Sequence, residues 1–432
     1  MGTMTRQEKI LFTLIQLFFA TLFFSKATSF NVAITGAIVL YSFTWTTLPE
    51  KFTLLKQRPY IVLMLLFLGY ELISLAFSEN PARGLHYLKI HLPLLLFPAS
   101  LGLITLSRTF RDKILLGFAI ITTIIGLACL LFSVYQYNQV PRSDIFYNDN
   151  LTMLLKRQSI YIAAAVNIAI FIFGYFIAFK RLAFKPLMLL AIGFLAVFSY
   201  LLASRVNLII LALATIGFSF HYIFSRKRIM EGIALVMGLF LAGFLIGKFF
   251  PATLNRYKEL TFSKFNYENT GPESHFNVKA TADQWNGANF RLAAWNCGWE
   301  VFKENPLSGT GIGDKEVALR KKYAEKNFHF ALKTDKNVHN NYLDLLFSLG
   351  IVGLMIFLFA WLILPLWQAL KFRDYLSVLI ILTFALVWVS EVYFNRNFGA
   401  MIVGFFIPFL LADKFKTLSA ASDQSDFSGS KP

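Results

Sequence analysis

Residues 159–179 read SIYIAAAVNIAIFIFGYFIAF and contain no charged side chain. A helix needs about 20 consecutive apolar residues to cross the hydrocarbon core of a bilayer, so this stretch predicts a transmembrane helix. The whole chain has the same character, because 56% of its 432 residues are hydrophobic and 15% are charged, against about 25% charged residues in a soluble domain. The sequence therefore predicts an all-α polytopic membrane protein. It excludes a disordered chain, a disulfide scaffold and a secreted globular enzyme.

Comparable apolar runs recur on both sides of this stretch and predict about twelve transmembrane helices. Together with the quoted run, their approximate ranges are 9–25, 28–48, 59–78, 86–106, 114–135, 159–179, 185–203, 206–224, 229–247, 340–364, 375–393 and 397–412.

Lysine and arginine gather in alternate connections between these runs. The basic connections are 51–58, 108–113, 180–185, 225–228, 371–374 and the C-terminal tail with Lys414 and Lys416. Because cytoplasmic loops carry an excess of both residue types, the pattern predicts that both chain termini lie in the cytoplasm. The net charge of +17 is therefore attributed to membrane orientation, and no nucleic-acid partner is predicted.

The pattern divides the chain into four predicted parts. These are transmembrane helices 1–9 in residues 1–247, a periplasmic loop domain in 248–339, transmembrane helices 10–12 in 340–412, and a disordered cytoplasmic tail in 413–432. A structureless loop as long as the second part is improbable in a compact protein, so the loop domain is expected to contain helices of its own.

The loop domain contains two local patterns. Four apolar side chains recur at helical spacing and predict an amphipathic helix over 288–304, with its apolar stripe against the membrane-embedded body: Leu292, Trp295, Trp299 and Phe302. The segment NPLSGTGIGD, residues 305–314, has alternating glycines that permit tight turns. It lacks the Gly-Lys-Ser/Thr ending of a phosphate-binding Walker A loop, so it is interpreted as a strained turn.

His339 stands where the polar loop ends and the tenth predicted span begins. Asn340 or Asn341 can cap the new helix, and the positive end of the helix macrodipole disfavours a protonated imidazole. A neutral ring can accept a proton, which suits His339 to general-base catalysis. The alternative is an interfacial histidine that hydrogen-bonds to loop backbone. Downstream, Gly350 and Gly353 predict a close helix-packing patch.

Two arginines on the predicted outer side are candidates for anion binding. Arg205 lies in the nearly absent connection between the seventh and eighth spans, and a charge at the bilayer boundary is by default a functional candidate. The alternative is that Arg205 snorkels to the outer headgroups. Arg291 sits at the edge of the amphipathic stripe, where its guanidinium can point into a cleft between loop and bundle.

Further cations are expected on the same side of the membrane: Arg83, Lys89, Lys156, Arg157 and Arg396. Each alone is typical of an anchor that flanks a span, but together with Arg205 and Arg291 they favour an anionic ligand. Because arginine pairs with phosphate bidentately, the predicted ligand is a diphosphate.

The motifs that the sequence lacks also constrain its function. HExxH, paired CxxC and Asp-x-Asp motifs are absent, so neither a metal nor another cofactor is predicted. Acidic residues in the spans lie near their ends, at Glu71, Glu231, Asp344 and Glu391. Ion-coupled transporters usually carry such residues deeper in the membrane.

The stretch from about residue 190 to 365 resembles the shared domain of the bacterial O-antigen ligase and O-antigen polymerase superfamily. The ligase signature is a histidine followed by Asn, Ser or Gln, and then, further on, Gly-x-x-Gly. In this chain the signature positions are His339, Asn340, Gly350 and Gly353. Two further pieces resemble family elements: Arg291-Leu-Ala-Ala-Trp295 with NPLSGTGIG downstream, and the pair Ser204-Arg205.

The resemblance implies a glycosyltransferase of C-type layout in the bacterial inner membrane. Its long loop would lie between the ninth and tenth helices, and its active site would face the periplasm. The implied donor is O-antigen glycan on undecaprenyl diphosphate, and the implied acceptor is a sugar hydroxyl of lipid A–core oligosaccharide. Neither ATP nor a metal is implied, because the donor carries its own leaving group.

The resemblance also implies roles for individual residues. His339 would take the proton of the acceptor hydroxyl as the hydroxyl attacks the anomeric carbon. Arg205 and Arg291 would bind the diphosphate and stabilise the charge that it gains on leaving. Further residues expected to contact substrate are Asn340, Arg83, Lys89, Arg157 and Arg396.

Three alternatives stay open at this point. An O-antigen polymerase shares the fold and the donor, and a protein O-oligosaccharyltransferase of the same superfamily transfers glycan to protein hydroxyls. A flippase or exporter of lipid-linked glycans belongs to another class. An exporter needs access from both sides of the membrane, whereas the polar candidates here collect on the predicted outer face.

Overall fold

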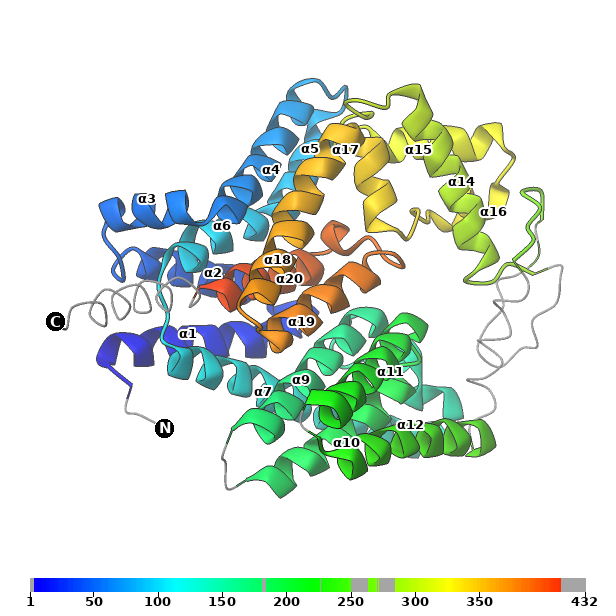
Figure 1. Ribbon diagram of the computed structural model, residues 1–432. Coiled ribbons are helices and arrows are strands. Elements are labelled where there is room, and N and C mark those ends of the chain that lie inside the picture. Colours follow the sequence, from blue (N-terminus) through cyan, green and yellow to red (C-terminus); the bar gives the residue numbers. More distant parts are fainter. Residues whose placement is uncertain are drawn as a thin grey trace.

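The computed structural model describes residues 4–180, 184–225, 227–249, 263–269, 271 and 284–412. Over these residues every regular element is a helix, as Figure 1 shows. The predicted disordered tail, 413–432, lies outside the described residues, as do 250–262 and 272–283 of the predicted loop domain.

The helices of the first half of the chain are α1 (Arg6–Leu22), α2 (Thr28–Ser42), α3 (Leu48–Gln57), α4 (Pro59–Ala76), α5 (Pro81–His91), α6 (Pro93–Ser100), α7 (Arg108–Gln139), α8 (Asn148–Leu151), α9 (Ser159–Phe179), α10 (Lys185–Leu201) and α11 (Arg205–Phe220). They are followed by α12 (Ile229–Phe249), α14 (Asn289–Glu304), α15 (Lys315–Glu325), α16 (His329–Thr334), α17 (Asn341–Leu358), α18 (Leu364–Lys371), α19 (Tyr375–Val387) and α20 (Asn397–Leu411).

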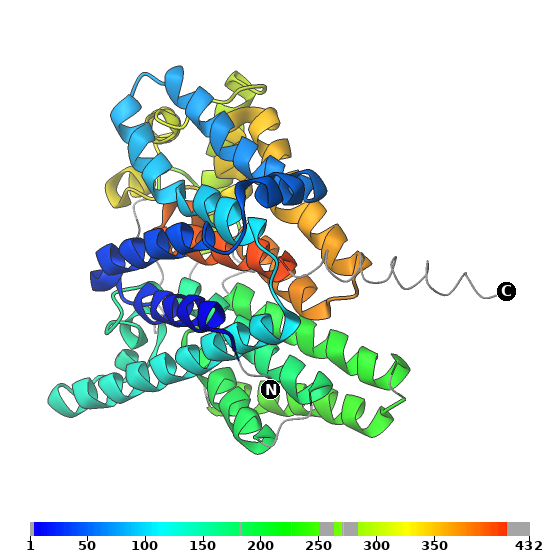
Figure 2. The same cartoon turned by 90° about the vertical axis from the view of Figure 1, so that its left-hand side faces the viewer.

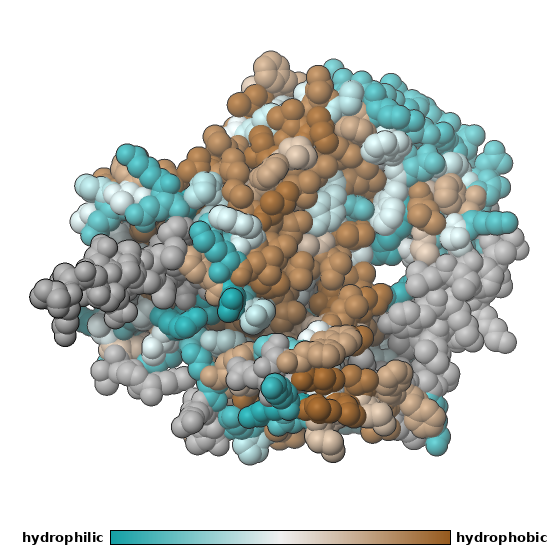
Figure 3. Space-filling view, in the orientation of Figure 1, coloured by the Kyte–Doolittle hydropathy of each residue, from teal (hydrophilic) through white to brown (hydrophobic). Residues whose placement is uncertain are grey.

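Four helical stretches in the described part of the chain are long and apolar enough to cross a membrane: Pro59–Ala76, Arg108–Gln139, Ser159–Phe179 and Asn341–Lys371. Shorter apolar helices are Lys185–Leu201, Arg205–Phe220, Ile229–Gly238, Tyr375–Val387 and Asn397–Leu411. In Figure 3 a broad hydrophobic surface crosses the middle of the molecule over α4, α17 and α18. The protein is thus a helical membrane protein, as predicted, while the count of twelve spans stays a prediction.

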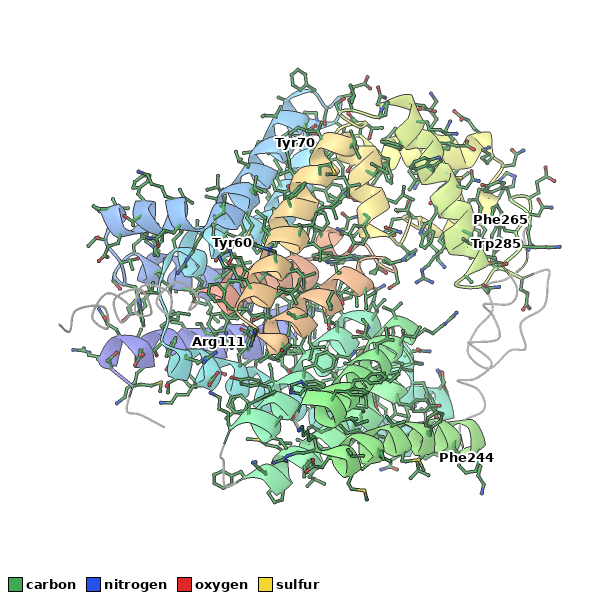
Figure 4. The ribbon with its side chains drawn as sticks, viewed as in Figure 1. Tyr60, Tyr70, Arg111, Phe244, Phe265 and Trp285 are labelled. Atoms are coloured by element: carbon green, nitrogen blue, oxygen red, sulfur yellow. The ribbon has the colours of Figure 1, made fainter. Side chains whose placement is uncertain are left out.

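The helices lie in layers. In Figures 1 and 2, α9–α12 form the lower part of the molecule, α4–α6 and α17 form the upper part, and α20 lies between them. Figure 4 separates the two ends of the bundle, with Tyr60 and Arg111 at one end and Phe244, Phe265 and Trp285 at the other. For these five residues, those predicted to share one side of the membrane lie at the same end.

Cations join helix ends that were predicted to be cytoplasmic. Arg111 of α7 lies 2.7 Å from Asp374, directly before α19, and Lys180 after α9 lies 2.6 Å from Asp112. Arg58 is fully buried and donates hydrogen bonds to three backbone carbonyls, those of Gly102, Ile104 and Ala412. These contacts tie one end of the bundle together, and the assignment of that end to the cytoplasm stays a prediction.

Two predicted boundaries are wrong near the middle of the first half. The predicted span 86–106 is divided, since α5 ends at His91 and α6 begins at Pro93, a residue that has no N–H to donate to the preceding turn. Helix α7 begins at 108 and not at 114, because the Ser107 hydroxyl accepts a hydrogen bond from Phe110 N at 3.2 Å and caps the helix there. The predicted connection 108–113 is therefore helical.

The predicted span 375–393 also ends early, because α19 closes at Val387. Residues 388–396, called the α19–α20 connection below, contain a short 3₁₀ turn at Tyr393–Asn395. The carbonyl of Trp388 accepts a hydrogen bond from Asn341 N at 2.8 Å, so it is used by the start of α17 and not by a further turn of α19. The apolar pattern continues through Val389 and Val392, which is why hydropathy alone placed the boundary too late.

Helix α17 is interrupted at Gly350, whose φ of +67° is not helical. A Cβ atom at this position would lie 2.1 Å from the carbonyl oxygen of Leu307. The prediction that Gly350 belongs to a helix-packing patch is therefore wrong, because it is a backbone break against which the glycine-rich turn docks. Gly353 does pack closely on a neighbouring helix, since its Cβ would lie 3.0 Å from the Tyr70 ring of α4.

The turn at 306–311 supplies hydrogen bonds that the break removes from α17. Its N–H groups at Thr310 and Gly311 donate to the carbonyls of Phe347 and Ser348, both at 2.9 Å. In the other direction, Ile351 N donates to Pro306 O at 2.9 Å. Gly309 and Gly311 have φ values of +71° and +96°, which glycine adopts readily; the predicted turn is therefore present, while its strain stays a prediction.

Helix α14 confirms the predicted helix over 288–304, but it buries a different face. Of the predicted stripe, Leu292 and Trp299 are exposed, whereas Trp295 and Phe302 are partly buried, so only part of the stripe packs on other residues. The buried residues are Asn289, Phe290, Ala293, Ala294, Cys297, Gly298 and Val301. The apolar side chains among them form a second hydrophobic core with Trp285 and Phe328. In its described part the loop domain is thus partly helical, as expected.

Candidate active site

A cavity of about 560 Å³ lies where α11, α14 and the α19–α20 connection meet. Arg205 and Arg291 both line it, together with Ser204, Trp295 and Ser390. The structure therefore brings together two arginines that are far apart in the sequence and that were predicted to bind one diphosphate.

Gly287 lies between the two guanidinium groups. A Cβ atom built on it would be 3.1 Å from Arg291 Nη1 and 3.2 Å from Arg205 Nη2. Because both guanidinium groups approach one point, their like charges repel each other, and an anion bound to both would offset that repulsion. The absence of a side chain at 287 leaves the guanidinium groups facing the same small space.

Backbone carbonyls orient Arg291 from two directions. Its Nη1 donates to Gly287 O at 2.6 Å, and its Nε and Nη2 donate to Ser390 O at 3.4 and 3.3 Å. Carbonyl groups are neutral, so these bonds fix the guanidinium without cancelling its charge. The arginine is half-buried at the cavity wall.

Arg205 is the first residue of α11 and follows the N-cap residue Ser204. A buried polar network anchors this helix end on α9. Asn207 Nδ2 donates to Ser204 Oγ at 2.8 Å and to Ile160 O at 3.2 Å, and Asn167 Nδ2 donates to Asn207 O at 2.7 Å. The positive end of the α11 macrodipole therefore lies at the cavity and adds to the charge of Arg205.

His339 directly precedes α17, and its backbone is left-handed with φ of +46°. The next residue, Asn340, caps the helix as predicted, since its side-chain oxygen accepts a hydrogen bond from Leu343 N at 3.0 Å. The His339 Nδ1 atom lies 2.9 Å from Glu391 Oε2. The imidazole is 23% exposed and meets the Phe290 ring edge-on, with the ring centres 5.9 Å apart.

Glu391 lies in the α19–α20 connection, outside the helices, and is 7% exposed. Burial alone raises the pKa of this carboxyl. The hydrogen bond and charge of His339, the Val392 N–H and the charge of Arg291 oppose that effect and hold the pKa below its usual value. The carboxylate is therefore ionised at neutral pH and can only accept hydrogen bonds.

Neighbouring residues of the α19–α20 connection join the histidine to the arginine cavity. Ser390 lines the cavity and accepts the bonds from Arg291, and the following residue, Glu391, binds His339. His339 itself lies outside the cavity lining, and its partner Glu391 directly follows a residue that lines the cavity.

The remaining predicted cations lie outside the cavity lining. Arg83 forms a bidentate ion pair with Glu316 of α15, with bonds of 2.6 and 2.8 Å, and this pair links α5 to the loop domain. Lys89 is exposed on α5. Arg157 points toward Leu22 O at 3.5 Å and Arg396 is exposed beside α20. The structure therefore divides the predicted cluster into one cationic pair and several separate side chains.

Sequence reasoning missed three contributors to the site. Glu391 was noted as an acidic residue near a span end, but its sequence position gave no sign of contact with His339. Ser390 contributes a backbone carbonyl, which carries no signal in the residue type. Gly287 lies directly before the predicted amphipathic helix, and its proximity to Arg291, four residues on, was the available clue.

A second, apolar cavity of about 590 Å³ lies between α11 and α19. Its walls include Leu213 and Phe218 on one side and Leu379 and Leu386 on the other. Val389 lines both this cavity and the arginine cavity. The cationic site therefore borders a hydrophobic groove that continues along two apolar helices.

Comparisons with known proteins indicate which family this chain resembles. No curated protein matches the chain at a significant level. The sequence model of the O-antigen ligase family matches residues 190–358, a segment that contains Arg205, Arg291 and His339. Members of this family are glycosyltransferase-like enzymes, ligases or polymerases. Residues 190–358 of the chain are therefore similar to the O-antigen ligase family.

Proposed function

We propose that this protein is an O-antigen ligase, which transfers a glycan from a polyprenyl diphosphate to a sugar hydroxyl of lipid A–core oligosaccharide. The observation that carries this proposal is the shared cavity of Arg205 and Arg291, joined to His339 through Ser390 and Glu391. The family match supports the class of reaction, and the geometry supports the assignment of roles.

The cationic pair suits a diphosphate leaving group. Two guanidinium groups on either side of Gly287 can each pair with phosphate oxygens. Negative charge grows on the bridging oxygen as the bond to the anomeric carbon breaks, and fixed donors aimed at that charge stabilise the transition state. The carbonyls of Gly287 and Ser390 hold Arg291 in place before substrate arrives, so its reorganisation costs little.

His339 suits the role of general base. The acceptor hydroxyl oxygen attacks the anomeric carbon and forms the new glycosidic bond, while the bond from that carbon to the diphosphate oxygen breaks and its electron pair stays on the diphosphate. The hydroxyl proton passes to the free ring nitrogen of His339. A single displacement of this kind inverts the anomeric configuration.

The apolar cavity between α11 and α19 supports a lipid-linked donor. A polyprenyl chain needs a hydrophobic path that starts beside the diphosphate, and Val389 borders both cavities. A nucleotide-sugar donor has no comparable apolar tail. The helices that line this groove are apolar themselves, so the tail can stay in the membrane while the diphosphate reaches the arginines.

The test is a reconstituted transfer assay. Purified protein in liposomes is given lipid-linked glycan and lipid A–core, without nucleotide, and glycosylated lipid A–core is measured. His339→Ala is expected to abolish transfer while donor binding remains. His329→Ala is the matched control, because this histidine is exposed on α16 in the same loop domain.

Each other outcome identifies a different function. Extension of the lipid-linked glycan with lipid A–core left bare indicates a polymerase, and transfer to a protein hydroxyl indicates the protein-modifying branch. Movement of donor across the bilayer by the His339→Ala variant indicates an exporter. Wild-type transfer by that variant contradicts the proposed mechanism.

A further inference from the structure

The α19–α20 connection lies beyond residue 358, where the family match ends, yet it contacts each part of the site. Trp388 O accepts a hydrogen bond from Asn341 N at 2.8 Å, at the start of α17. Ser390 O accepts from Arg291, and Glu391 binds His339. A segment outside the matched domain therefore completes the site.

We propose that Glu391 is the positioning residue of the transferase. Its carboxylate holds His339 with the proton on Nδ1, which leaves Nε2 as the proton acceptor, and it stabilises the positive ring that forms during transfer. This proposal rests on the proposed function and adds a residue to which neither the family match nor the sequence pattern assigns a role.

Both oxygens of Glu391 are engaged, which fixes the carboxylate. Oε2 lies 2.9 Å from His339 Nδ1, and Oε1 accepts a hydrogen bond from Val392 N at 2.9 Å. The second bond ties the side chain to its own connection, so the carboxylate cannot turn away from the imidazole without losing it.

The imidazole is held from the remaining sides as well. The His339 backbone N–H donates to Asn337 Oδ1 at 2.8 Å, and Phe290 packs edge-on against the ring. The Nε2 atom makes no hydrogen bond within the described residues, and the side chain is 23% exposed. One ring nitrogen is thus committed to Glu391, while the other is available to a substrate.

The chemistry of a carboxylate decides the tautomer. An ionised carboxylate has no proton to donate, so Nδ1 must carry the ring proton and Nε2 must carry the lone pair. When Nε2 takes the acceptor's proton, the ring becomes positive beside a fixed negative charge. The other titratable groups that act on Glu391 or lie in its electrostatic range are Arg291, Tyr161 and Tyr393.

The experiment compares Glu391→Gln, Glu391→Asp and Glu391→Ala in the full chain, in the transfer assay above. The glutamine keeps the size of the side chain and an oxygen acceptor but loses the charge. We expect kcat to fall about 10- to 100-fold in the glutamine variant, part of the usual effect of a general base, with the donor KM little changed. The aspartate variant should recover part of the rate, and the alanine variant should be slowest.

The pH profile is a readout that a merely structural role would not move. The Glu391 carboxyl, whose pKa lies below its usual value, must be ionised to accept the hydrogen bond of the imidazole, so kcat of the unmodified protein should fall as the pH drops through that pKa. Glu391→Gln has no such titrating group, so this acidic limb of kcat against pH should be absent from its profile. Asp344→Asn is the matched control: Asp344 is a buried carboxylate that pairs with Lys315 at 2.6 Å, and its loss should lower the melting temperature without moving the limb.

The tautomer can be read in the unmodified protein by ¹⁵N NMR of labelled histidine, with His339→Ala used for assignment. A proton on Nδ1 supports the proposal, and a proton on Nε2 overturns it, whether or not any variant folds. Unchanged kcat and pH profile in the folded Glu391→Gln variant also overturn it, and the proposed function then still stands. Wild-type transfer by His339→Ala would remove the proposed function itself.

Discussion

The two ends of the bundle use arginine in opposite ways. At the end that carries Arg58 and Arg111, the guanidinium groups are buried and contact backbone carbonyls or the Asp374 carboxylate. At the other end, Arg205 and Arg291 are half-buried and face one cavity on either side of Gly287. A positive residue at a helix end can therefore have either of two roles. Its burial and its position at a cavity, and not its charge, distinguish an internal tie from a candidate ligand site.

The largest effect is expected from breaking a tie. Arg111→Ala leaves the Asp374 carboxylate buried without its 2.7 Å partner, and breaking a buried ion pair costs about 3–5 kcal/mol. We expect a large fall in melting temperature in detergent. Arg111→Leu with Asp374→Leu should restore much of it, since the unpaired charge is then absent. Wild-type stability in the single variant would show that Arg111 is not a tie.

The cavity arginines should behave in the reverse manner. Arg291→Ala and Arg205→Ala are expected to lower the transfer rate about 10²- to 10³-fold, the usual loss for one donor to a developing anion, with little change in melting temperature. Binding of the lipid diphosphate should weaken in parallel. If either variant unfolds and keeps its activity per folded molecule, the contrast between the two ends is wrong.

The break in α17 should be sensitive to a single methyl group. In Gly350→Ala, the new Cβ meets Leu307 O, and the left-handed backbone at φ of +67° disfavours any side chain. We expect a loss of about 1–3 kcal/mol of stability, seen as a lower melting temperature and faster proteolysis of the loop domain. Gly36→Ala is the control, because no atom lies within 4 Å of the added Cβ.

The smallest effect should come from filling the gap between the guanidinium groups. Gly287→Val places atoms where Arg205 Nη2 and Arg291 Nη1 now lie just over 3 Å from the Cβ position. The arginine tips can move, so we expect the protein to fold and its donor KM to rise about tenfold, equivalent to about 1.4 kcal/mol of lost binding. An unchanged KM would indicate that the diphosphate does not bind between these groups.

Hydropathy predicted a helix correctly where the apolar run and the helix have the same bounds. Residues 159–179 form one helix with the predicted bounds, because nothing in the run interrupts helical hydrogen bonding. Pattern reasoning failed where hydrogen bonding decided the boundary instead. Pro93 divides a predicted span, and the Trp388 carbonyl is taken by α17. Neither the proline nor this hydrogen bond can be recognised in the hydropathy of the chain.

The site was predictable in part for the same reason. Arg205, Arg291 and His339 carry residue types and positions that point to chemistry, and the structure places the two arginines at one cavity. Glu391 could not be paired with His339 from the sequence, because 52 positions separate them and only tertiary packing joins them. Arg83 was grouped with the site by charge alone, and its Glu316 partner explains why it lies elsewhere.

The break in α17 at Gly350 also has a consequence for how the chain folds into the membrane. The carbonyls at 347 and 348 and the N–H at 351 find their partners in the turn at 306–311, and unpaired backbone groups are costly within a bilayer. We therefore expect the settling of α17 in the membrane to be coupled to the folding of the preceding loop. His339 lies just before the N-cap residue of this helix, so the position of the proposed general base depends on the same contacts.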